Sequence, residues 1–244
     1  MNYNNYPHQQ PPSFFDSAAV QTQTNSIMKR VYVRMFIGLL ISAFAALGVA
    51  SSPAAMTFIF GDASGRSIVF WVMLIAMLVM AFMIPARLAK MSSGTVLLLF
   101  CIFSALMGAW LAPIFHAYSG PTIAKTFFIT SGTFGAMSVY GYFTKSNLDK
   151  MGSYLMMALF GLIILMIVNI FWNNGTMGWV ISIVGLLIFI GLTAWDTQQV
   201  KRLAAANLEP QLADKLATMG AMNLYLDFIN LFLFLLRIFG GGRD

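Results

Sequence analysis

The sequence predicts an all-α membrane protein, a bundle of seven transmembrane helices with the seventh helix at its centre. Hydrophobic residues make up 59% of the 244 residues and charged residues only 9%, whereas about 25% of the residues in soluble domains are charged. So few charges cannot cover a water-facing surface, which excludes a soluble globular protein. The single cysteine excludes a disulfide framework and a cysteine-based metal cluster. The net charge of +6 is not gathered into a basic run, so we expect no nucleic-acid partner.

Seven apolar runs have the length of a membrane-spanning helix. About 20 apolar residues, each rising about 1.5 Å, cross the hydrocarbon core of a bilayer. None of the runs shows the alternating pattern of a membrane β-barrel, so helices remain the way to satisfy the backbone in lipid. The run at 123–143 is the least hydrophobic of the set. The runs lie at 35–52, 68–86, 95–113, 123–143, 152–171, 177–195 and 221–239.

The first 27 residues differ in composition from the rest of the chain. They are rich in Asn, Gln and Pro and show no helical apolar period. We therefore predict a disordered cytosolic tail over 1–27 and a seven-helix transmembrane domain over 28–244. The segment 197–217 is the one connection with room for structure of its own, such as a short surface helix. Without a large extramembrane domain, function is expected within the bundle.

The basic residues are distributed unevenly between the two sides of the predicted bundle. Lys and Arg are enriched in cytoplasmic loops, so the side with more of them predicts the orientation. The N-terminus is then cytoplasmic, and an odd number of spans places the C-terminus outside. Ten basic residues lie on the N-terminal side (Lys29, Arg30, Arg34, Arg87, Lys90, Lys145, Lys150, Lys201, Arg202 and Lys215) and four on the other (Arg66, Lys125, Arg237 and Arg243).

Asp196 and Asp227 are the two acidic residues that fall at or inside apolar runs. A charged side chain in lipid is costly and usually faces a partner or a cavity. If the two carboxyl groups meet, both cannot ionise cheaply, so they would share a proton and act as a pH sensor. Their oxygens also suit a hard cation, which makes both residues candidate Ca²⁺ ligands. The alternative is structural: Asp196 reaches water at the membrane boundary, and an Arg or Asn satisfies Asp227.

Two arginines lie at a similar depth and are candidates to latch onto one carboxylate. Arg87 ends the second run and Arg34 begins the first. Either residue can instead be an ordinary cytoplasmic anchor of its helix.

Two runs carry polar stripes at helical spacing. Residues of the seventh run recur on one helical face, which we expect to turn toward the other helices. Small and hydroxyl-bearing residues of the fourth run form a complementary face that allows either close packing or a polar path. The stripes are Gly220, Asn223, Asp227 and Asn230 in the seventh run, and Ser131, Gly135, Ser138 and Tyr142 in the fourth; of these Asn223, Asn230, Ser131, Ser138 and Tyr142 are the pore-lining or packing candidates.

Three segments resemble the Bax inhibitor-1/YccA-like family, also called the transmembrane Bax inhibitor motif family: GAMSVYGYFTKSNL (135–148), GLTAWDTQ (191–198) and LYLDFINLFLFLLRIFG (224–240). The chain is most similar to the bacterial inner-membrane branch. The resemblance implies seven helices with the last wrapped by the others, and a pH-sensitive Ca²⁺ leak governed by Asp196 and Asp227. It also implies an Arg latch, for which MIPARLAK offers Arg87 alone, and association of some members with a membrane AAA protease. No cofactor is expected beyond the transported Ca²⁺.

Three classes of function remain to be weighed. The first is a proton-gated cation leak. The second is an intramembrane aspartyl protease, which we disfavour because the chain lacks the GxGD and PAL segments of those enzymes; we predict that the chain is not an enzyme. The third is a regulatory partner of a membrane protease or another membrane complex, without transport of its own.

Overall fold

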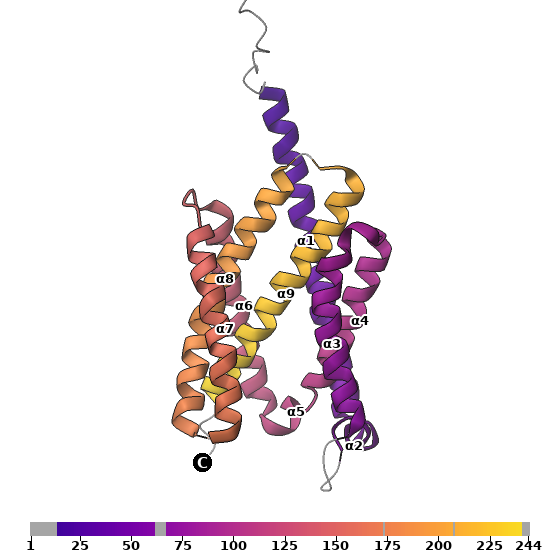
Figure 1. Cartoon of the computed structure of the whole chain (residues 1–244), viewed down its shortest axis with the longest axis vertical. Coiled ribbons are helices and arrows are strands. Elements are labelled where there is room, and N and C mark those ends of the chain that lie inside the picture. The colour runs from indigo at the N-terminus through magenta and orange to yellow at the C-terminus, as the bar shows by residue number, and fades with distance from the viewer. Residues whose placement is uncertain (1–13, 62–66, 173, 207, 241–244) are drawn as a thin grey trace, which may run out of the picture.

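The computed structural model describes residues 14–61, 67–172, 174–206 and 208–240, with side chains from Val20 onward. Throughout these segments the regular elements are helices (Figure 1). Their bounds are α1 Phe14–Ala50, α2 Pro53–Phe60, α3 Ile68–Arg87, the 3-10 turn η1 Leu88–Lys90, α4 Ser93–Leu111, α5 Ile114–Ala117, α6 Gly120–Phe143, α7 Asp149–Trp172, α8 Gly175–Ala205 and α9 Pro210–Gly240.

Small polar residues mark where the apolar runs begin as helices. Each accepts a hydrogen bond from a backbone N–H of the first helical turn, a group that has no partner within the helix. These caps are Ser67 before α3, Ser92 before α4, Ser119 before α6 and Asn174 before α8. Pro85 lies in the last turns of α3, close to where the helix ends at Arg87.

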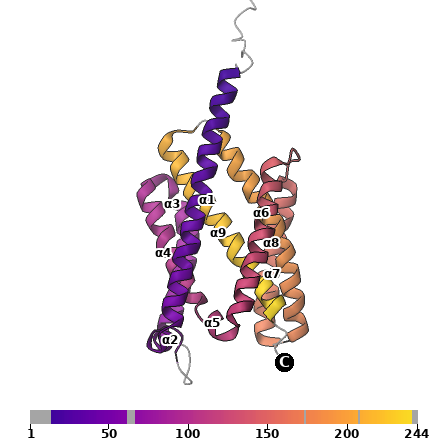
Figure 2. The same ribbon diagram turned by 180° about the vertical axis from the view of Figure 1, so that it is seen from behind.

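The long helices form two groups with α9 between them. Helices α1, α3 and α4 lie on one side and α6, α7 and α8 on the other, while α9 crosses diagonally from one group to the other (Figures 1 and 2). The helix α9 packs against α1, α4, α6 and α8. We call the end of the bundle with the start of α1 and the α8–α9 connection the upper end, as in Figure 1, and the end with α2 and α5 the lower end.

Six of the described helices are long and apolar enough to cross a membrane: α1, α3, α4, α7, α8 and α9. The interior of the bundle is formed mainly by α9, because 67% of its most apolar window is buried, against 6% for α7. Helix α6 matches the run at 123–143 and is 24 residues long, but its most apolar stretch falls short of those of the six helices.

Glycines allow two of the closest helix contacts. A Cβ atom at Gly108 of α4 would clash with the carbonyl oxygen of Ser42 in α1, and one at Gly141 of α6 would clash with that of Ala194 in α8. Neither position can hold a side chain unless the backbones move apart. Small residues at such crossings are typical of helix packing in membranes.

The first helix begins earlier than the composition indicates. It starts at Phe14, so residues 14–27, which the sequence places in the disordered tail, are helical, while residues 1–13 lie outside the described part of the chain. Thr24, Ile27, Met28 and Val31 are buried on one face of α1. This buried stripe crosses the expected boundary at residue 27, and packing stabilises a segment whose local composition does not favour a helix.

The connection between the sixth and seventh runs is also shorter than expected. The sequence leaves 197–217 as a connection, whereas α8 continues to Ala205 and α9 begins at Pro210. Val200, Ala204, Ala213 and Ala217 are buried in these extensions. Both helices therefore continue beyond their apolar runs, because one face of each still packs in the bundle.

Candidate functional site

The two acidic residues singled out in the sequence lie on neighbouring helices. Asp196 is on α8 and Asp227 on α9, two helices that pack against each other over much of their length. The two carboxyl groups are close enough to interact with each other electrostatically. Asp227 is only 4% exposed, and Asp196 is partly exposed. The fold thus brings together two carboxyl groups that are 31 residues apart in the chain.

One oxygen of this pair has no partner. The Oδ2 atom of Asp227 is buried and makes no hydrogen bond within the described residues. A buried polar atom without a partner is rare in folded proteins and calls for an explanation. A proton, a water molecule or a cation could satisfy such an oxygen, and each of these is mobile.

Hydroxyl groups of α6 and α8 flank the pair. Thr193 and Thr197, one turn apart and on either side of Asp196 along α8, are fully buried. The Thr197 hydroxyl donates to the Ser138 hydroxyl of α6 at 3.5 Å. The Thr193 hydroxyl donates to the Phe189 carbonyl within its own helix. The hydroxyls that neighbour Asp196 along α8 are therefore bonded to the helix backbone and to α6.

Neither candidate latch contacts the pair. The Arg34 guanidinium forms an ion pair with Asp214 of α9, with Nη2 and Oδ1 2.6 Å apart, and also donates to the Thr218 hydroxyl at 2.8 Å. Arg87 is exposed at the end of α3. Asp214 is therefore the aspartate that Arg34 reaches, thirteen residues before Asp227.

The other cations near the upper end of the neighbouring helices also have partners of their own. The Lys201 ammonium donates to the Tyr142 carbonyl at 2.6 Å and lies 4.5 Å from the centre of its ring. Arg202 forms an ion pair with Asp149 of α7, with 2.7 Å between Nη1 and Oδ2. The charges of the pair are thus not balanced by a cation that contacts them in the described chain.

The polar stripe of α6 divides into three environments. Ser131 is half-buried and donates to the Phe127 carbonyl of its own helix at 2.8 Å. Ser138 is buried against Thr197. Tyr142 lies at the upper end, where its hydroxyl donates to Asn25 of α1 at 2.8 Å. Of the three, Ser138 lies beside the helix that carries Asp196.

The polar stripe of α9 is only partly turned inward. Gly220 and Asp227 are buried, but Asn223 is exposed, and Asn230 is partly buried with its amide donating to the Leu226 carbonyl at 2.8 Å. The expectation that the whole stripe faces other helices is therefore wrong for Asn223. Helix α9 crosses the bundle obliquely, so its inward face changes along its length.

The sequence does not indicate that Asp214 and Lys201 each join two helices. Asp214 accepts from both Arg30 and Arg34 of α1, at 3.3 and 2.6 Å. The spacing of these two arginines, one helical turn apart, was the available signal for a shared acidic partner. The apolar runs place residue 214 in a connection between helices, so the sequence does not indicate Asp214 as the shared partner.

The pair alone does not form a complete metal site. Among the described residues there is no group of three or more His, Cys, Asp or Glu side chains that could hold a metal ion. Ca²⁺ takes six to eight oxygen ligands, and two carboxylates supply at most four. A cation at this place would keep part of its hydration shell, which suits an ion in passage better than a resident one.

The fold and this geometry define a multi-pass helical membrane protein with a buried carboxyl pair in its interior. Comparison with known families places it further: residues 24–244 match the family described as "Inhibitor of apoptosis-promoting Bax1". The chain belongs to the Bax inhibitor-1 family, as its motifs indicate.

Its relatives include bacterial membrane proteins of similar length. The chain is 41% identical to the inner membrane protein YbhL of Escherichia coli K12 over 219 residues, which cover 88% of this chain and 92% of YbhL. It is also 41% identical to an uncharacterized protein of Borreliella burgdorferi, over 90% of this chain and 94% of the relative. An uncharacterized protein of Rickettsia prowazekii is 39% identical over 89% and 90%. The chain is thus a multi-pass protein of the inner membrane.

Proposed function

We propose that this protein is a passive, pH-sensitive leak for Ca²⁺ and other cations, in which Asp196 and Asp227 form the proton sensor and a transient cation site. The observation that carries the proposal is the proximity of two interacting carboxyl groups on α8 and α9, with one buried oxygen of Asp227 left without a hydrogen-bond partner. No other described part of the bundle combines two acidic groups with burial.

Electrostatics explains why such a pair responds to pH. Two negative charges side by side in a poorly solvated place repel each other strongly, and each also loses hydration. One shared proton removes much of this cost and leaves the pair with a single negative charge. A cation that replaces the proton has the same effect. Protons and cations therefore compete for Asp196 and Asp227.

The direction of the chain in the membrane is part of the proposal. We place the upper end in the cytoplasm because the basic residues of the α1, η1, α6–α7 and α8–α9 regions gather there, as cytoplasmic loops require. We also take α6 as a seventh span, because α5 lies at the lower end and the α6–α7 connection at the upper end (Figure 1). The start of α1 is then inside and the end of α9 outside.

Transport fits the site better than hydrolysis. An aspartyl protease needs two carboxyl groups that reach a water molecule and a substrate together, and Asp227 is 4% exposed. Regulation of a membrane AAA protease or another membrane complex is the alternative function. Under this alternative, Asp196 and Asp227 would have a structural role only.

The test is a Ca²⁺ flux assay with the purified full chain in liposomes, read across a range of pH. We expect Asp227→Asn and Asp196→Asn to change the flux and to flatten its pH profile. Asp149→Asn is the matched control, because Asp149 is half-exposed at the start of α7 and pairs with Arg202. If Asp227→Asn keeps both the wild-type flux and its pH profile, the proposal is wrong. A wild type without flux that co-purifies with a protease would favour the regulatory alternative.

A further inference from the structure

Arg237 is a cation that the proposed function does not use. It lies in the last turn of α9, at the lower end of the bundle. Its side chain is exposed and has no ion-pair partner among the described residues. The three ion pairs of the described chain are all made by arginines of α1 and α8, at the upper end. Within the described part of the chain, the charge of Arg237 is thus not balanced by an acidic side chain.

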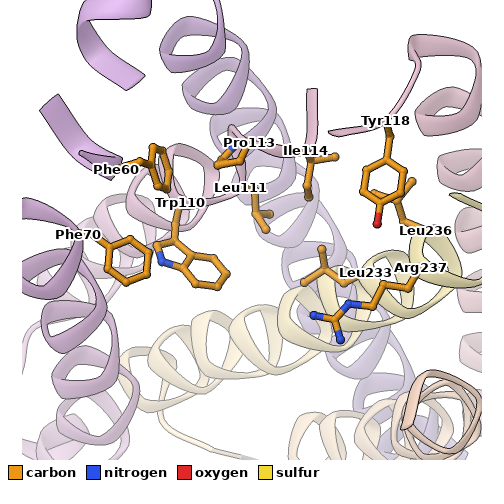
Figure 3. A pocket seen from close by; sticks show the side chains of 10 residues that line it. All are labelled: Phe60, Phe70, Trp110, Leu111, Pro113, Ile114, Tyr118, Leu233, Leu236 and Arg237. Carbon is orange, nitrogen blue, oxygen red and sulfur yellow. The ribbon is translucent and has the colours of Figure 1, made fainter. Parts of the chain in front are cut away.

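The Arg237 side chain borders an apolar cavity of about 300 Å³. Aromatic and aliphatic side chains from α2, α3, α4, α5 and α9 form its walls, among them Phe60, Phe70, Trp110 and Leu233. In Figure 3 the guanidinium lies beside Leu233 and extends into the space that faces Trp110. A space of this kind suits a flexible hydrocarbon chain with a negative charge at its end.

Arg237 also lines a second cavity, of about 370 Å³. It lies between α9 and the helices α7 and α8, and its walls include Asn169, Ile170 and Gly178. The Asn169 Oδ1 atom accepts from the backbone N–H of Asn174 at 3.3 Å, so its amide group remains as a donor. The guanidinium and this amide give the second cavity the polar groups that a headgroup needs.

We propose that these two cavities bind one anionic phospholipid, with its phosphodiester on Arg237 and one acyl chain in the aromatic cavity. A guanidinium binds phosphate oxygens through two parallel hydrogen bonds. The membrane around the chain supplies the lipid. A free phosphate ion would use the guanidinium and leave the apolar cavity unfilled, so the lipid accounts for both features. The proposal is independent of cation transport.

The experiment is native mass spectrometry of the purified full chain with added phosphatidylglycerol or phosphatidylethanolamine. We expect the wild type to retain one phosphatidylglycerol, with an affinity about tenfold higher than for phosphatidylethanolamine, because the ammonium group of the zwitterionic lipid competes with Arg237 for the phosphodiester. Arg237→Gln should remove this preference, and Arg237→Lys should keep part of it. Lys125→Gln is the matched control, because Lys125 is an exposed cation near the start of α6, at the same end of the bundle, and lines neither cavity.

Three results would overturn the proposal. The first is equal retention of the two lipids by the wild type. The second is an equal effect of Arg237→Gln and Lys125→Gln, which would show a general attraction of the surface for anions. The third is displacement of the lipid by inorganic phosphate at equal concentration, which would make the headgroup charge the only determinant. Retention of lipid does not depend on flux, so failure of the leak proposal would leave this measurement intact.

Discussion

Arg34 of α1 and Asp214 of α9 form a 2.6 Å ion pair that joins the first helix to the start of the last one. Arg34 also donates to the backbone carbonyl of Asp214 at 2.7 Å, and its side chain is 14% exposed. We expect Arg34→Gln to lower the free energy of unfolding by about 2 kcal/mol, because hydrogen bonds to charged groups are lost and the carboxylate of Asp214 keeps only a weaker partner. Denaturant unfolding in detergent micelles measures this.

Arg30 provides the control for this prediction. Its guanidinium is 3.3 Å from the same carboxylate, and its side chain is 44% exposed. An exposed pair of this kind contributes little, so Arg30→Gln should cost less than about 0.5 kcal/mol. Equal losses for the two variants would contradict the view that burial gives Arg34 its role.

The crossing of α6 and α8 at Gly141 leads to a second prediction. A methyl group at Gly141 would meet the Ala194 carbonyl oxygen, so Gly141→Ala should destabilise the protein by about 1–3 kcal/mol as the helices separate. Gly135, two turns earlier on the same helix, has open space at its Cβ position. Gly135→Ala should therefore stabilise by about 0.5–1 kcal/mol through helix propensity. Thermal unfolding in detergent distinguishes the two, and a shift in the same direction would refute the packing argument.

The apolar runs predict the bounds of a helix well where most of its surface faces lipid. The run at 68–86 became α3, Ile68–Arg87, and the run at 152–171 became α7, Asp149–Trp172. Few residues of helix α7 are buried inside the bundle. The apolar composition of α7 therefore follows mainly from its contact with lipid. Hydropathy failed where helices leave the apolar region, as at the start of α1 and around the α8–α9 connection, because tertiary packing stabilises those ends.

Of the site, sequence could predict the two carboxyl groups but not their neighbours. An acidic residue within an apolar run is expensive enough to stand out, which marked Asp196 and Asp227. The partner of Arg34 cannot be deduced from the sequence. Asp214 lies outside the apolar runs, so hydropathy does not place it on a helix that faces Arg34. The two cavities that Arg237 lines are formed by residues from five helices and from three helices, and no local sequence pattern indicates them.

Tyr225, two residues before Asp227, is the largest fully buried side chain of α9. Its hydroxyl lies 2.7 Å from the Ser42 hydroxyl, which itself contacts the carbonyl oxygens of Gly38 and Ser104. Serine has one proton to donate and these carbonyls can only accept, so Tyr225 is the donor to Ser42.

We therefore expect Tyr225→Phe to cost about 1 kcal/mol, the usual net value of one hydrogen bond. The loss stays small because the variant leaves no unsatisfied carbonyl, and the ring keeps its edge contact with Phe100. Tyr140→Phe, at an exposed position on α6, should be neutral. Unfolding in detergent gives both values. A loss of more than about 3 kcal/mol for Tyr225→Phe would mean that the hydroxyl has a further role, for instance in holding α9 for Asp227.

The pH response of the flux is the most direct prediction about Asp196 and Asp227. Neither Arg34 nor Arg87 contacts the pair, so adding a proton breaks no ion pair there and has no latch to release. Its main effect is to neutralise the charge that attracts a cation. We therefore expect Ca²⁺ flux to fall as the pH drops from about 8 to about 5, because protons then compete with the cation for the two carboxyl groups. Liposomes with the same pH inside and outside isolate this effect from the proton gradient. Asp196→Asn, which removes one of the two titrating groups, should weaken the dependence. A wild-type flux that rises in acid would instead mean that protonation opens the path between α8 and α9, and the competition between protons and cations would be refuted.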